Sequence, residues 1–169
     1  EAARALDRLQ PVGYNRPVPV IPGVHGIEVE FINAGHLLGS AYARVRIGDK
    51  SILFGGDLGR YRRPVLPDPT PVTEADILLV ESTYGDRLHE RDDDGERLAR
   101  IVTDVAARGG RLIVPSFAIG RVEEVLYWLK RLEDERRVPV LPVYIDSPMA
   151  LGALQFYTSR ITELDKEVR

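Results

Sequence analysis

The sequence predicts an α/β protein built in two parts, and three observations indicate this class. Apolar and polar residues alternate with a period of two in the first half, which is typical of strands with one buried face. A continuous apolar run at residues 76–81 indicates a strand buried on both faces. Later apolar residues recur with the period of a helix between further apolar runs, which favours parallel strands joined by crossover helices.

The first elements follow from local composition. Residues 2–10 predict the end of a helix that Pro11 stops, and the proline- and glycine-rich residues 11–25 predict a loop. In residues 26–34, Ile27, Val29 and Phe31 alternate with glutamates, so we expect that apolar face to be buried.

A hairpin and a surface connection are expected next. Residues 42–48 alternate again, a turn follows at Gly48-Asp49-Lys50, and residues 51–55 return as the second strand of the hairpin. Four prolines between residues 60 and 75 predict a connection on the surface.

The second half predicts an alternation of helices and buried strands. After residue 81 we expect a helix from Leu98 to the Gly109-Gly110 pair, a strand at 111–116, a helix near 121–136, a strand at 140–146 and a helix that Ser147 caps and Pro148 begins.

Composition excludes several classes of site. The chain has 169 residues, 44% of them hydrophobic, and no cysteine, so disulfides and thiolate metal sites are excluded. The net charge of -3 gives no overall basic surface for nucleic acid. No apolar run approaches the roughly 20 residues of a membrane span, and no signal peptide opens the chain, so we expect a cytoplasmic protein without membrane contact. Because the chain begins at Glu1 without methionine, we expect it to be a piece of a longer protein.

Three residues with metal-binding or acid–base chemistry follow predicted strands. These are His36, Asp57 and Glu81, and two of them stand beside glycines that allow a sharp turn. Histidine and carboxylate together form a zinc ligand set, and a carboxylate can bridge two metal ions. Taken alone, a histidine such as His36 in a glycine-flanked turn is more often structural, Asp57 is also an ordinary turn residue, and Glu81 also suits a strand end.

The segment from Ser116 to Arg121 joins a predicted strand to a predicted helix. A helix start offers free backbone N–H groups that can hold a phosphate, and the hydroxyl of Ser116 and the guanidinium of Arg121 suit the same ligand. The alternative is that Ser116 caps the helix and Arg121 is a solvated first-turn residue.

Taken together, four segments resemble the β-CASP branch of the metallo-β-lactamase superfamily, the RNA-processing nucleases akin to the mRNA 3′-end cleavage endonuclease. They are AGHLLGSA at 34–41, FGGDLGR at 54–60, ESTYGDR at 81–87 with His89, and PSFAIGR at 115–121. The resemblance implies that residues 1–87 form the C-terminal half of a metallo-β-lactamase αββα sandwich. It implies that residues 88–169 begin a β-CASP insert with a parallel α/β layer.

The resemblance also implies roles for single residues. His36 would bind one zinc ion, and Asp57 would bridge two. Glu81 would orient a histidine supplied from further along the chain. Ser116, Gly120 and Arg121 would contact the substrate phosphate, an assignment that is our inference within the matching segment. His89 lies in a matching stretch without an implied role, and His25 matches nothing.

The sequence also departs from the family. The His-x-His-x-Asp-His segment of the family's metal site is absent from these 169 residues, and no histidine follows His89. The resemblance implies zinc-dependent hydrolysis of single-stranded RNA by the parent protein, of the RNA 3′-end-processing type, with this chain alone inactive. The alternative is a catalytically silent RNA-binding or scaffold subunit of the same fold. A further alternative is a different metallo-hydrolase of the superfamily that acts on small esters. The segment at Glu81 and the segment at 115–121 argue against this alternative. Besides single-stranded RNA, a second copy of the protein in a homodimer is a partner that the sequence allows.

Overall fold

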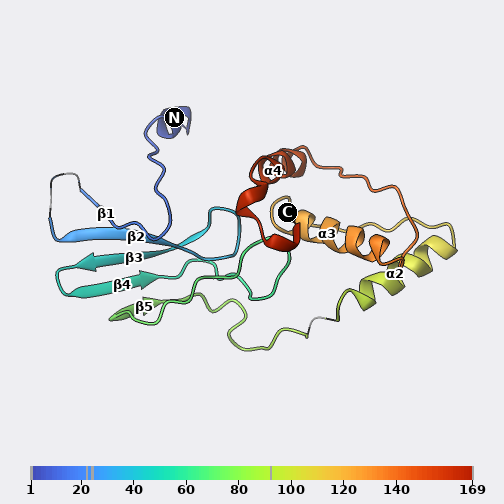
Figure 1. The fold of residues 1–169 in the computed structure, drawn as a ribbon, viewed down its shortest axis with the longest axis horizontal. Coiled ribbons are helices and arrows are strands. Elements are labelled where there is room, and N and C mark those ends of the chain that lie inside the picture. The colour runs from blue at the N-terminus through green and yellow to red at the C-terminus, as the bar shows by residue number, and fades with distance from the viewer. Residues whose placement is uncertain (1, 22, 24, 92, 169) are drawn as a thin grey trace. The chain divides into compact units, whose positions relative to one another are not determined.

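The computed structural model of the chain describes residues 2–21, 23, 25–91 and 93–168. Figure 1 shows the elements along the chain. In order they are α1 (Ala2–Leu6), β1 (Val18–Pro19), β2 (Ile27–Asn33), β3 (Ala41–Ile47), β4 (Lys50–Phe54), β5 (Ile77–Leu79), α2 (Glu96–Ala107), α3 (Arg121–Asp134), α4 (Pro148–Ser159) and the short 3-10 helices η1 (Ile161–Glu163) and η2 (Lys166–Val168).

The chain divides into two compact units. Unit 1 contains the residues up to 61 together with 68–83, and unit 2 contains residues 62–67 together with those from 84 onward. All five strands belong to unit 1, and α2, α3 and α4 belong to unit 2. The α/β class predicted from the sequence is therefore confirmed for the described residues.

Unit 1 is built on a mixed sheet in the order β1-β2-β3-β4-β5 (Figure 1). The pairs β1–β2, β2–β3 and β3–β4 are antiparallel, and β4–β5 is parallel. The predicted hairpin is confirmed, with Ile47 opposite Lys50 at the turn. The helix predicted at 2–10 is shorter, since α1 ends at Leu6. After it, the N–H groups of Arg8 and Leu9 donate to the carbonyls three residues earlier, as in a turn, before the chain reaches Pro11.

The buried face of β2 differs from the prediction. Ile27, Val29 and Phe31 are only half-buried, whereas Glu30 is 8% exposed. Glu30 lies opposite Arg44 of β3, and its Oε2 accepts a hydrogen bond of 2.6 Å from Arg44 Nη2. Arg46 adds a second guanidinium at 3.6 Å. A charge-assisted pair of this kind satisfies the carboxylate, so the strand can bury a polar residue that alternation alone assigns to solvent.

The predictions of further buried strands are wrong for this structure. Strand β5 forms, but its residues Ile77 and Leu78 are 53% and 59% exposed rather than buried. Residues 111–116 and 140–146 join no sheet, and Ile113 is 84% exposed. Strand formation needs a hydrogen-bonding neighbour, and apolar sequence does not supply one. The parallel α/β layer expected for the second half is therefore not formed among the described residues.

The end of α2 and the start of α4 follow the local signals that predicted them. Gly109 N–H donates to Ala106 and Gly110 N–H to Val105, so the glycine pair closes α2 by satisfying its last carbonyls. Ser147 caps α4, because its hydroxyl accepts the Ala150 N–H at 3.2 Å.

The apolar core of unit 2 centres on Leu132 of α3, which has no exposed surface. It packs with Ala99 and Val102 of α2 and with Val138. The segment at residues 62–67 is a second contributor, since Val65 is 6% exposed and its carbonyl accepts the Asp165 N–H at 2.9 Å.

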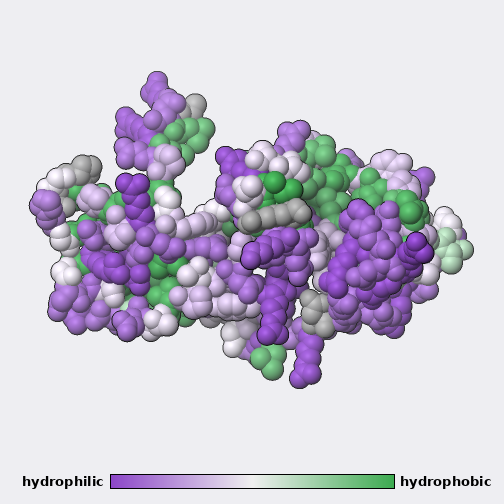
Figure 2. Space-filling view, in the orientation of Figure 1, coloured by the Kyte–Doolittle hydropathy of each residue, from purple (hydrophilic) through white to green (hydrophobic). Residues whose placement is uncertain are grey.

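Unit 2 also carries exposed apolar surface. Figure 2 shows hydrophobic atoms gathered over α4, where Met149, Leu151 and Phe156 are 68%, 47% and 47% exposed. In the described part of the chain, no helix combines the length and the apolar character that crossing a bilayer requires.

Candidate metal and catalytic site

The topology of unit 1 delivers the three candidate residues to one end of the sheet. Strands β2 and β4 run in the same direction because each is antiparallel to β3, and β5 is parallel to β4. The carboxyl ends of β2, β4 and β5 therefore point the same way. His36 follows β2, Asp57 follows β4 and Glu81 follows β5, so a rigid strand leads to each of them.

His36 and Asp57 lie beside each other. His36 Nε2 is 3.8 Å from Asp57 Oδ2, and the two side chains are 42% and 77% exposed. This separation is too long for a hydrogen bond. It is shorter than about 4.0–4.3 Å, the sum of two zinc–ligand distances for histidine and carboxylate, so one ion can contact both atoms.

Local hydrogen bonds fix the turn that presents His36. Asn33 Oδ1 accepts the Gly35 N–H at 3.0 Å, and Ser40 Oγ accepts the N–H groups of His36 and Leu37 at 3.1 and 3.0 Å. Gly35 has a φ of 62°, a conformation that favours glycine. The backbone of His36 is thereby held without using its imidazole.

A close backbone contact joins the Asp57 turn to the His36 turn. Gly59 N–H donates to the carbonyl of Ala34 at 2.9 Å. A Cβ atom on Gly59 would lie 2.3 Å from Gly35 C, which is closer than side-chain carbons approach other atoms. Glycine at position 59 therefore allows the two turns to lie in contact.

Glu81 ties the third strand end to the Asp57 turn. Its Oε1 accepts the Leu58 N–H at 2.6 Å, and its Oε2 accepts the Thr83 hydroxyl at 2.6 Å. The Thr83 hydroxyl, then the Leu58 N–H and the charge of His36 hold the pKa of Glu81 below its usual value. Glu81 is thus a carboxylate that fixes the loop next to Asp57.

The donor set is a partial match to a zinc site. Among residues 2–21, 23, 25–91 and 93–168, no group of three His, Cys, Asp or Glu side chains is placed to hold a metal ion. His89 contacts the edge of Tyr84 instead, with ring centroids 5.4 Å apart. His36 and Asp57 therefore fit two positions of a zinc ligand set, and two donors do not complete a tetrahedron.

The predicted phosphate segment has a mixed outcome. Helix α3 begins at Arg121 with Gly120 as its N-cap, so the alternative that Ser116 caps this helix is wrong. The Ser116 hydroxyl instead lies 3.4 Å from the Val114 carbonyl. Arg121 is 60% exposed and lies 3.9 Å from the carboxylate of Glu124. Phosphate contact by Ser116, Gly120 and Arg121 stays a prediction.

Sequence reasoning missed three residues that build this site. Ser40 accepts the N–H of His36, and Thr83 donates its hydroxyl to Glu81. Gly59 allows the Asp57 turn to lie against the His36 turn. All three stand inside the quoted motifs, four residues after His36, two after Glu81 and two after Asp57. A short hydroxyl side chain at such spacing is a recognisable signal of a local turn bond.

Known proteins align along this chain. No family model matches it. Ribonuclease TTHA0252 of Thermus thermophilus is 34% identical over 170 residues, which covers 100% of this chain and 38% of that protein. Cleavage and polyadenylation specificity factor subunit 3 of Dictyostelium discoideum is 32% identical, over 98% of this chain and 21% of its own length. An RNase J-like protein of Methanocaldococcus jannaschii is 33% identical, over 85% and 35%.

The alignments cover 85% to 100% of this chain, yet the chain spans 38% or less of the length of these relatives. The matching proteins carry the names of ribonucleases and of a cleavage factor, as the four motifs lead one to expect. The chain is therefore similar, over most of its length, to parts of ribonucleases and of a cleavage and polyadenylation factor, in agreement with the resemblance of its four motifs to the β-CASP branch of the metallo-β-lactamase superfamily.

Proposed function

We propose that the full-length protein is a zinc-dependent ribonuclease that hydrolyses phosphodiester bonds of single-stranded RNA in RNA processing. The observation that carries the proposal is the approach of His36 Nε2 and Asp57 Oδ2 to 3.8 Å at the end of the sheet. The names of the aligned relatives, among them a ribonuclease and a cleavage and polyadenylation factor, support RNA as the substrate. An RNA substrate agrees with the cytoplasmic location expected from the sequence.

The chain contributes part of the active site in this proposal. His36 would hold one zinc ion through its imidazole, and Asp57 would hold zinc through its carboxylate. Bound zinc lowers the pKa of water to near neutrality and neutralises phosphate charge. Glu81 keeps the Asp57 turn in place through Leu58, and the hydrogen bonds from Thr83 and Leu58 that lower its pKa favour its charged form. Arg121, exposed at the start of α3, is available to a phosphate of the RNA.

The domain assignment is part of the same proposal. Residues 1–87 would be the C-terminal part of the metallo-β-lactamase domain, and residues 88–169 the N-terminal part of the β-CASP domain. The division between units 1 and 2 at residues 83 and 84 supports this boundary, whereas residues 62–67 group with unit 2.

A catalytically silent RNA-binding or scaffold subunit is the second candidate. It is favoured by one observation, that no group of three metal-binding side chains occurs among the described residues. The two candidates differ in their metal content, since only the nuclease needs two zinc ions in the full-length protein.

Substitution of Asp57 in the full-length protein tests the proposal. We expect Asp57→Ala to lower the RNA cleavage rate at least about 100-fold, because loss of a metal ligand exceeds the effect of its outer partners. Asp49→Ala, an exposed aspartate in the β3–β4 turn at the other end of β4, is the matched control and should cleave at the wild-type rate.

Zinc analysis by atomic emission separates the two candidates. We expect two zinc ions in the full-length protein, and fewer than two in the isolated 169-residue chain. Wild-type cleavage by Asp57→Ala would remove Asp57 from the mechanism. A full-length protein that binds RNA without zinc and without cleavage would establish the silent subunit instead.

A further inference from the structure

Unit 2 contains a cavity that the proposed nuclease chemistry does not use. Its volume is about 590 Å³, and it lies against α3, α4 and the two 3-10 helices. Small-molecule sites in proteins usually measure about 300–1,000 Å³ and are mostly apolar with a few polar groups. Leu126, Leu154, Tyr157, Ile161 and Leu164 supply the apolar walls here.

Glu123 is among the residues that line this cavity, and its carboxylate is buried without a hydrogen-bond partner. Glu123 is 5% exposed, and neither Oε1 nor Oε2 has a hydrogen-bond partner in the described structure. A carboxylate withdrawn from water in this way is costly unless a cation or hydrogen-bond donor meets it. Glu123 stands in the first turn of α3, where the helix dipole eases the cost but supplies no direct partner.

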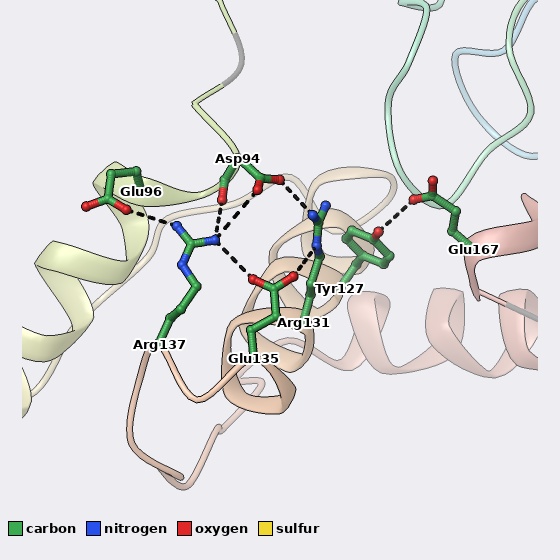
Figure 3. Close-up of polar contacts among 7 residues, drawn as sticks. All are labelled: Asp94, Glu96, Tyr127, Arg131, Glu135, Arg137 and Glu167. Atoms are coloured by element: carbon green, nitrogen blue, oxygen red, sulfur yellow. Dashed lines mark hydrogen bonds and ion pairs between the residues drawn. The ribbon is translucent and has the colours of Figure 1, made fainter.

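The other charged groups of the cavity are already paired with one another. Lys130 pairs with Asp134, and Tyr127 O–H donates to Glu167 at 2.8 Å. Figure 3 shows Arg131 held between its carboxylate partners, Asp94 at 2.8 Å and Glu135 at 2.9 Å.

The guanidinium of Arg63 pairs with Glu124, the neighbour of Glu123. Four acidic and two basic side chains line the cavity, so the unmatched charge is negative: Glu123, Asp134, Glu135 and Glu167 against Lys130 and Arg131.

We propose that this cavity binds an organic cation, an alkylguanidinium or alkylammonium group. Its charged head would meet the carboxylate of Glu123, and its alkyl stem would lie along Leu126, Leu154 and Tyr157. A metal ion is a poorer fit, because no group of three suitable donors occurs among the described residues and the walls are apolar. The same chemistry has two sources, a free small molecule or an arginine or lysine side chain of the full-length protein.

The experiment is a thermal-unfolding titration of the full-length protein with n-butylguanidinium, with n-butylurea as the neutral probe of similar shape. Glu123→Gln removes the buried charge. Glu133→Gln is the matched control, since it makes the same change on the same helix outside the cavity. For a free cation, the guanidinium raises the melting temperature of the wild type and of Glu133→Gln. Its affinity for Glu123→Gln is about 10–100-fold lower, the value of one charge-assisted hydrogen bond.

The second source gives a different result. If the protein's own cationic side chain occupies the cavity, the probe has no effect and Glu123→Gln melts several degrees below Glu133→Gln, because a buried ion pair is broken. Two results would overturn the proposal. One is no probe effect combined with a Glu123→Gln variant as stable as the wild type, and the other is an equal response of wild type and Glu123→Gln to either probe.

Discussion

Replacing Gly59 by alanine is expected to separate the two turns that hold His36 and Asp57. A Cβ atom at position 59 would lie 2.3 Å from both C and O of Gly35 and 2.4 Å from the carbonyl oxygen of Ala34. These are backbone atoms, so no side-chain rotation can relieve the contact. The backbone of Gly59 is outside the left-handed region, so the effect is steric alone.

The size of the effect follows from these distances. Ordinary van der Waals contact begins at 3.4 Å, so one turn must withdraw from the other by about 1.1 Å. Overpacking of this kind costs about 1–3 kcal/mol, and weakening the Gly59–Ala34 hydrogen bond adds about 1 kcal/mol. We therefore expect Gly59→Ala to lower the free energy of unfolding by about 2–4 kcal/mol. A displacement near 1 Å between groups of an active site lowers a rate by about 100-fold.

Urea unfolding followed by circular dichroism measures the first effect, and RNA cleavage by the full-length variant measures the second. Gly13→Ala is the matched control, because a Cβ atom there meets nothing within 4 Å. We expect the control to stay within about 0.5 kcal/mol of the wild type and to keep its activity. A Gly59→Ala variant with the urea midpoint and cleavage rate of the wild type would refute the backbone contact as the link between the turns.

Two further predictions concern the core of unit 2 and the carboxylate at the end of β5. Leu132→Ala should lower the free energy of unfolding by about 3–4 kcal/mol, whereas the same change at Leu88, which is 97% exposed, should cost less than about 0.5 kcal/mol; equal losses in urea unfolding would contradict this. The lowered pKa of Glu81 makes its carboxylate stabilising above the ordinary value of 4.5, and this contribution is lost as the pH falls through the folded pKa. Thr83→Val should raise that pKa toward 4.5, and an unmoved value in a carbon NMR titration would exclude the Thr83 hydroxyl as its main cause.

The parts of the fold that local sequence specifies were predicted correctly. Helix α4 begins where Ser147 precedes Pro148, and α2 ends at Ala107, just before the Gly109-Gly110 pair that satisfies its last carbonyls, because caps depend on a few adjacent residues. The placement of His36, Asp57 and Glu81 at the ends of strands also followed from the alternating and continuous apolar segments that precede them.

The parts that depend on distant partners were not predicted. Segments 111–116 and 140–146 have strand-like sequences, but pairing requires a neighbour that sequence does not name. Glu30 is buried because Arg44 and Arg46 arrive from β3, and the contact at Gly59 depends on the backbone of another turn. These are tertiary effects, which override local patterns.

Unit 2 is discontinuous in sequence, because residues 62–67, which precede β5, belong to it together with the residues from 84 onward. This segment contributes the buried side chain of Val65 and the ion pair between Arg63 and Glu124. A truncation that begins at residue 84 would leave the helices without this strip, so a single cut cannot separate a complete unit 2 from unit 1. A chain that begins at residue 62 would keep the strip, but it would also keep residues 68–83, and with them strand β5, of unit 1.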